Sequence, residues 1–115
     1  MTYTLIYNPG CGTCRKGLAL LQENGVEPEL RKYMNVSERL SIEELKDIAS
    51  KIEGGSPRAF LREKEARLTG LSETASDEEV FAAMAENPKL IQRPIGIKGD
   101  KAVLGRPNER LLDLI

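Results

Sequence analysis

The sequence predicts an α/β fold in which a small sheet carries helices on both faces. The order of expected elements is strand, helix, strand, a mostly helical stretch, two short strands and a final helix. The N-terminal strand–helix–strand unit needs a crossover connection, which makes its two strands parallel. At 115 residues the chain is long enough to bury a core without disulfide or metal staples. We therefore expect a single domain spanning residues 1–115.

The first part of the chain supplies the strand–helix–strand unit. Thr2 to Tyr7 alternates in polarity and is rich in residues that favour strands, so a strand is expected there. A helix is expected from about Thr13 to Asn24, with Gly25 ending it. Val26 to Tyr33 is expected to form the second strand, interrupted early by Pro28.

The middle of the chain, from about 41 to 88, reads as helical. Ser41-Ile42-Glu43-Glu44 and Ser76-Asp77-Glu78-Glu79 are capping boxes, and helically spaced apolar residues follow each of them. Ser56-Pro57 predicts a further helix with proline at its first position, and that helix would carry Arg62.

The chain ends with a predicted hairpin and a last helix. Ile95 to Ile97 and Ala102 to Leu104 are short apolar runs separated by Gly99-Asp100, which predicts a two-residue turn between antiparallel strands. Pro107 is expected to open the final helix. Its inward-facing residues are expected to be Leu111, Leu112 and Ile115.

Composition excludes several classes of function. The chain has no histidine, which rules out Ser-His and Cys-His catalysis and imidazole metal sites. Two cysteines are too few for a structural zinc site, so no metal is expected. A net charge of −1 provides no global attraction for nucleic acid or an anionic membrane. With neither a membrane span nor a signal-peptide pattern in the sequence, we expect a cytoplasmic protein.

The two cysteines, Cys11 and Cys14, are three positions apart where the first helix is expected to begin. The helix dipole and unpaired backbone N–H groups at that place stabilise a thiolate, and Arg15 and Lys16 add positive charge. A CxxC motif beside a strand–helix–strand unit indicates the thioredoxin-like class. The alternative for Cys11 is a small buried apolar residue. Cys14 is either the resolving partner of Cys11 or a residue that faces the core.

Arg62, Arg93 and Arg106 form a second set of candidates. Arg93 and Arg106 each precede a proline, which favours extended backbone. Taken singly, each of the three arginines is explained as a solvated surface residue. Arg62 lies beside Glu63 and Glu65 in the sequence, and a surface ion pair would account for it.

Four segments together resemble the glutaredoxin-linked arsenate reductases along nearly the whole chain. They are Asn8-Pro9-Gly10-Cys11-Gly12-Thr13, Arg58 to Arg62, Asn87 to Ile95, and Gly105-Arg106-Pro107. The resemblance implies a thioredoxin-like fold with a helical insertion between the second strand and the C-terminal β-hairpin. It also implies that Cys11 is the nucleophile, and that Arg62, Arg93 and Arg106 gather around an oxyanion. The implied reaction converts arsenate to arsenite, with no bound cofactor and glutathione as co-substrate.

Three departures from that family pattern bear on mechanism. Tyr7 stands where members commonly have histidine, and Cys14 stands where they commonly have serine. The chain also stops at Ile115, as expected of the short members of the family. Cys14 could therefore replace glutathione as the resolving thiol, with glutaredoxin or thioredoxin reducing the disulfide. In thioredoxin-like folds the proline at position 94 is usually cis and faces the reactive cysteine, which would direct Arg93 toward it.

Two other functions remain open. Spx-type regulators share this fold and a CxxC motif at the same place, and they act by binding RNA polymerase with the disulfide as a switch. A general thiol–disulfide oxidoreductase would use Cys11 and Cys14 without any inorganic substrate.

Overall fold

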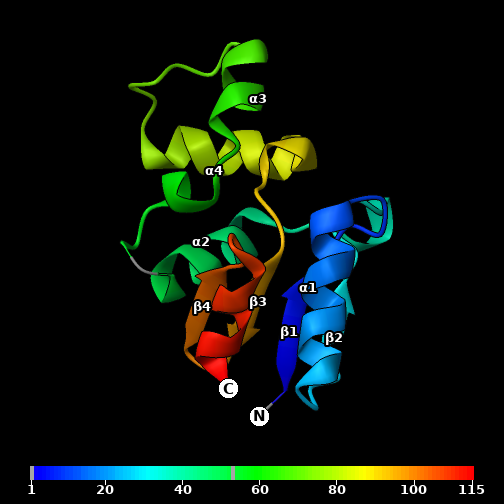
Figure 1. The fold of residues 1–115 in the computed structure, drawn as a ribbon. Helices are drawn as coiled ribbons and strands as arrows, with labels where there is room; N and C mark the ends of the chain where they lie inside the picture. Colours follow the sequence, from blue (N-terminus) through cyan, green and yellow to red (C-terminus); the bar gives the residue numbers. More distant parts are fainter. Residues whose placement is uncertain (1, 53) are drawn as a thin grey trace.

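The computed structural model describes residues 2–52 and 54–115 and contains one mixed sheet with helices on both faces (Figure 1). Its four strands run in the spatial order β2-β1-β3-β4. They span Tyr3–Ile6 (β1), Glu29–Arg31 (β2), Ile95–Lys98 (β3) and Lys101–Leu104 (β4). The β1–β2 pair is parallel, whereas β3 is antiparallel to both of its neighbours. This is the thioredoxin-like α/β fold that the sequence predicts.

Helices lie between β1 and β3 along the chain, and one more follows β4. The α-helices are Gly12–Glu23 (α1), Ile42–Lys51 (α2), Glu63–Leu68 (α3) and Asp77–Glu86 (α4). The 3₁₀ helices are Val36–Glu38 (η1), Pro57–Phe60 (η2), Pro88–Leu90 (η3) and Asn108–Leu114 (η4). The expected helical insertion is thus present between β2 and β3, and both predicted capping boxes form, at Ser41 and Ser76. Among the described residues no helix is both long and apolar enough to cross a membrane.

The two faces of the sheet bury two separate clusters, because successive side chains of a strand point to opposite faces. Tyr3 and Leu5 of β1 pack on the side of α1 and η4, whereas Ile6 packs in the larger cluster with α2 and α4. The Tyr3 hydroxyl donates to the Leu111 carbonyl at 2.7 Å and so ties β1 to η4. A Cβ at Gly96 of β3 would collide with that hydroxyl, which explains why glycine is needed there.

The helix predicted from Ser56-Pro57 to Arg62 is wrong. Only the 3₁₀ turn η2 forms, and Leu61 then pairs with Ile91 in an isolated antiparallel bridge. The Arg62 N–H donates to the Leu90 carbonyl at 2.8 Å, so it is not available to continue a helix from η2. Arg62 instead lies at the N-cap of α3, and its backbone position is set by a segment distant in the sequence.

Two further expectations need correction. The second strand is shorter than predicted, because only Glu29–Arg31 pairs with β1. The last helix is the 3₁₀ helix η4, in which Leu111 is buried and Leu112 half-buried. Ile115, expected to face inward, is 58% exposed.

Candidate active site

The loop after β1 is held by its own hydrogen bonds and places Cys11 at the start of α1. The Asn8 side-chain oxygen accepts from the Gly10 N–H at 3.0 Å, and the Asn8 carbonyl accepts from the Cys11 N–H at 2.9 Å. The Arg15 guanidinium reaches back to the Pro9 carbonyl at 2.8 Å. Cys11 is the N-cap residue of α1 and has extended backbone, so its side chain lies beside the first N–H groups of the helix.

The environment of Cys11 favours the thiolate. Partial burial by itself would raise the pKa of Cys11, but several groups oppose that effect. The backbone N–H groups of Cys14 and Thr13 and the Cys14 thiol stabilise the negative sulfur, and the positive charge of Arg93 acts on it. Together they lower the pKa of Cys11 to about 7. At neutral pH a large share of this thiol is therefore ionised.

The reaction of Cys11 with iodoacetamide is expected to follow this pKa. Its rate should rise as the pH increases through about 7, whereas an ordinary thiol responds near pH 8.5, roughly. Because folding lowers the pKa, the thiolate's contribution to stability is present above the unfolded value and is lost as the pH falls through about 7. Alkylation rates at a series of pH values, with mass spectrometry to identify the modified residue, test this. A midpoint near the ordinary value would contradict it.

Cys14 differs from Cys11 in burial and in charge. It lies in the first turn of α1, is 0% exposed, and packs in the cluster that contains Leu21 and Leu111. Burial and the nearby Cys11 thiolate raise the pKa of Cys14 to about 11, so this thiol stays protonated at neutral pH. The pair therefore combines a reactive, partly exposed sulfur with a buried, protonated one.

The three candidate arginines come from three segments, which a hydrogen bond between two of them and a shared cleft link to one another. The Arg106 Nε donates to the Arg93 carbonyl at 2.9 Å, which joins the two segments that precede the cis prolines Pro94 and Pro107. Arg93 is half-buried and its charge acts on both cysteines. The expectation that Pro94 follows a cis bond is confirmed.

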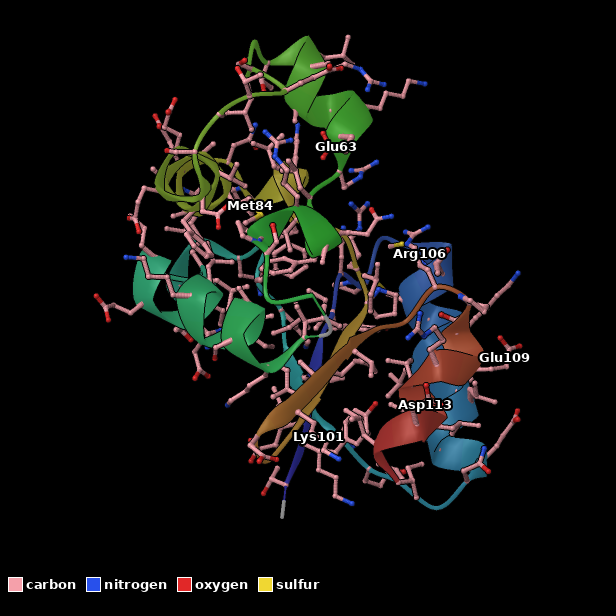
Figure 2. The ribbon with its side chains drawn as sticks, turned by 90° about the vertical axis from the view of Figure 1, so that its left-hand side faces the viewer. Glu63, Met84, Lys101, Arg106, Glu109 and Asp113 are labelled. Carbon is pink, nitrogen blue, oxygen red and sulfur yellow. The ribbon has the colours of Figure 1, made fainter. Side chains whose placement is uncertain are left out.

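Arg62 and Arg106 share a cleft of about 410 Å³. Figure 2 labels Glu63 and Arg106, which both line it, where the helical insertion meets the rest of the domain. Arg62 makes weak contacts, with the Lys89 carbonyl at 3.2 Å and the Glu65 carboxylate at 3.7 Å. The ion pair suggested for Arg62 by its sequence neighbours thus involves Glu65. Because both contacts of the guanidinium are long, it can turn toward a ligand.

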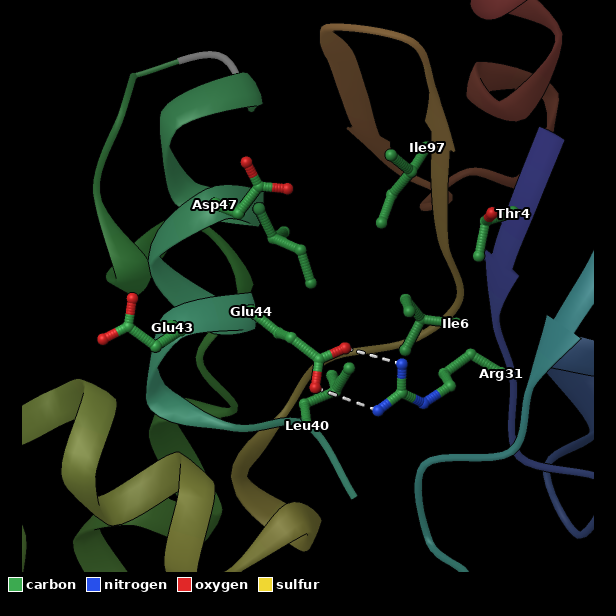
Figure 3. Close-up of a pocket in the computed structure, with 9 residues that line it drawn as sticks. Thr4, Ile6, Arg31, Leu40, Glu43, Glu44, Asp47 and Ile97 are labelled. Atoms are coloured by element: carbon green, nitrogen blue, oxygen red, sulfur yellow. Dashed lines mark hydrogen bonds and ion pairs between the residues drawn. The ribbon is translucent and has the colours of Figure 1, made fainter. Parts of the chain in front are cut away.

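A second pocket, between β1 and α2, contrasts with this cleft (Figure 3). Its arginine, Arg31, donates four hydrogen bonds. Two go to the carboxylate oxygens of Glu44, at 2.6 and 3.0 Å, and two go to the carbonyls of Glu38 and Arg39. The hydrogen bonds that Arg31 donates to Glu44, together with its charge, hold the pKa of Glu44 below its usual range. We therefore assign Arg31 a structural role, because four of its five N–H donors are already bonded to the protein.

Reasoning from sequence missed Tyr33, whose charge environment includes Arg93, both cysteines and Arg62. The sequence could have indicated Tyr33, because it follows the second strand of a parallel pair whose first strand leads into the cysteine loop. Within residues 2–52 and 54–115, no group of three or more His, Cys, Asp or Glu side chains could hold a metal ion.

The chain is similar to known proteins in sequence and in fold. The model of the ArsC family matches residues 6–114. An arsenate reductase of Haemophilus influenzae is 36% identical over the full length of both chains, and one of Rhizobium meliloti is 37% identical over the whole of this chain and 82% of its own length. The solved structure of an arsenate reductase from Vibrio cholerae superposes with a TM-score of 0.87 at 37% identity, covering 100% of this chain and 98% of that one. The chain therefore belongs to the ArsC family.

Proposed function

We propose that the protein is a thiol-dependent reductase that converts arsenate to arsenite, with Cys11 as the nucleophile. The observation that carries this proposal is the Cys11 sulfur at the start of α1, with its pKa lowered to about 7 and the half-buried Arg93 beside it. Arginine forks bind pairs of oxygens on tetrahedral anions, and they offset the repulsion between a thiolate and an anion. The arsenate reductases among the relatives support arsenate as that anion.

The proposed chemistry has two bond changes at Cys11. The thiolate attacks arsenic(V), an S–As bond forms, and an oxygen of arsenate leaves as water after it is protonated. A second thiol then attacks the Cys11 sulfur. The S–As bond breaks, its electron pair remains on arsenic, and arsenite with arsenic(III) is released while Cys11 is oxidised to a disulfide. Arg62, Arg93 and Arg106 would hold the arsenate oxygens through both steps.

Cys14 is well placed to be that second thiol. Each of the two cysteines influences the pKa of the other, so the two sulfurs are neighbours. The negative charge of the Cys11 thiolate contributes to the raised pKa of Cys14, and formation of the S–As bond removes that charge. Cys14 thus becomes easier to ionise once the adduct exists. Glutaredoxin or thioredoxin would then reduce the Cys11–Cys14 disulfide, and glutathione is the alternative second thiol.

Two substitutions of Cys14 separate its roles. Cys14→Ser keeps a hydroxyl donor to the Cys11 sulfur but removes the resolving thiol, whereas Cys14→Ala removes both. If Cys14 resolves the adduct, both variants should lose arsenate turnover when thioredoxin is the sole reductant. The pKa of Cys11, measured by alkylation, should rise more in Cys14→Ala than in Cys14→Ser.

The same assays should be repeated with glutathione and glutaredoxin. Restored turnover of Cys14→Ser with these partners would show that an external thiol replaces Cys14. Full activity of Cys14→Ser with thioredoxin alone would contradict internal resolution. Failure of the wild type to turn over arsenate with either set of partners would refute the proposed function.

A second candidate function, general thiol–disulfide exchange, is favoured by the pairing of an ionised thiol with a buried protonated one. A neutral substrate such as hydroxyethyl disulfide distinguishes the two functions, because it presents no charge to the arginines. An exchange enzyme would reduce it in the presence of thioredoxin far faster than it reduces arsenate.

A further inference from the structure

Two buried polar atoms near the cysteine loop lack a hydrogen-bond partner among the described residues: the Tyr33 hydroxyl and the Arg93 Nε. Buried polar groups in native proteins are nearly always paired, because leaving one unpaired is costly. The third such atom, the Asn108 side-chain oxygen, lies against Gly17 of α1 and is an acceptor, so it cannot donate to an anion. The first two therefore call for an explanation at the site itself.

The fold directs Tyr33 toward the site. Because β1 and β2 are parallel, the chain leaves both strands at the same edge of the sheet, where ligands of open α/β sheets usually bind. The cysteine loop follows β1 at this edge and Tyr33 follows β2. The Tyr33 N–H donates to the Arg31 carbonyl at 2.9 Å, and the side chain is 0% exposed in the cluster that contains Ile6 and Phe60.

The charges around the Tyr33 hydroxyl are those of the candidate site. The positive charges of Arg93 and Arg62 lower the pKa of the hydroxyl, whereas the two cysteine sulfurs raise it. Burial outweighs the arginines and raises the pKa of Tyr33 to about 12. The hydroxyl therefore keeps its proton at neutral pH and can donate a hydrogen bond.

We propose that Tyr33 is a further oxyanion-binding residue, whose hydroxyl donates to an oxygen of the bound anion while Arg93 Nε donates to another. This inference rests on the proposed function. A tetrahedral oxyanion presents acceptors in several directions. One ligand can therefore satisfy two donors that both lack partners among the residues that the structure describes. A neutral donor also adds a hydrogen bond without adding repulsion among the arginines. Because the hydroxyl is buried, the side chains that cover it must draw apart when the anion enters.

The test compares two tyrosines that each lose only a hydroxyl. In Tyr33→Phe the KM for arsenate should rise about tenfold or more, since hydrogen bonds to charged groups contribute most. Its kcat should change little, because the lost interaction is present in both the bound substrate and the transition state. Its thermal unfolding midpoint without ligand should stay the same or rise, because an unpaired buried hydroxyl has been removed.

Tyr3→Phe is the matched control. It loses the 2.7 Å hydrogen bond to the Leu111 carbonyl on the other face of the sheet, so its unfolding midpoint should fall while its KM for arsenate stays unchanged. An unchanged KM in Tyr33→Phe would overturn the inference, as would a fall in its unfolding midpoint like that of the control. If the wild type is inactive toward arsenate, the proposed function fails and this inference fails with it. An active wild type with an unaffected Tyr33→Phe variant refutes the inference alone.

Discussion

Replacing Cys11 by serine is expected to abolish arsenate-dependent oxidation of thiols. A serine hydroxyl stays protonated at neutral pH, and the chain has no histidine that could act as its general base. The groups that stabilise the Cys11 thiolate, the first N–H groups of α1 and Arg93, stabilise an anion but do not remove a proton. We expect turnover to fall by on the order of 10³-fold or more. The measurement is arsenite formation with defined thiol partners.

The thermal unfolding midpoint of Cys11→Ser shows whether the loss of activity is chemical. Cys11 is half-buried and outside the main core, so the variant should unfold within a few degrees of the wild type. A correctly folded Cys11→Ser variant with substantial turnover would mean that the nucleophile is misassigned.

Replacing Arg93 by alanine should produce the second largest loss. The guanidinium is half-buried, and its charge acts on both cysteines. Its Nε has no hydrogen-bond partner within residues 2–52 and 54–115. Hydrogen bonds from a charged donor contribute about 1.5–3 kcal/mol each, so kcat/KM for arsenate should fall on the order of 10²-fold. The pKa of Cys11 should also rise, because the Arg93 charge helps to lower it.

Arg93→Lys separates charge from geometry. Lysine keeps the positive charge but has no planar fork, so the pKa of Cys11 should stay low while kcat/KM for arsenate remains reduced. Arg67→Ala is the matched control, since Arg67 is an exposed residue of α3 whose ion pair with Glu73 spans 4.0 Å. Wild-type kcat/KM in Arg93→Ala, measured beside that control, would remove Arg93 from the binding site.

Local sequence patterns predicted the elements that depend on neighbouring residues. The capping boxes at Ser41 and Ser76 and the turn at Gly99-Asp100 join groups only a few positions apart, and all three form. The same reasoning failed for the helix from Ser56-Pro57, because the Arg62 N–H donates to Leu90 rather than to its own helix. The sequence pattern of one segment contains no information about a hydrogen-bond partner in a distant segment.

The candidate site divides in the same way. The reactive character of Cys11 follows from a CxxC motif at the start of a helix, so the sequence was sufficient to predict it. The resemblance named the three arginines, but only the fold brings Arg93 beside Cys11 and joins Arg106 to the Arg93 carbonyl. No local sequence pattern predicts that the Tyr33 hydroxyl is buried without a partner among the described residues. Its burial and its neighbours arise from packing between segments. The local chemistry of Cys11 could be predicted from the order of residues. The approach of Arg93 to Cys11 and the burial of the Tyr33 hydroxyl depended instead on how the sheet and its insertion pack.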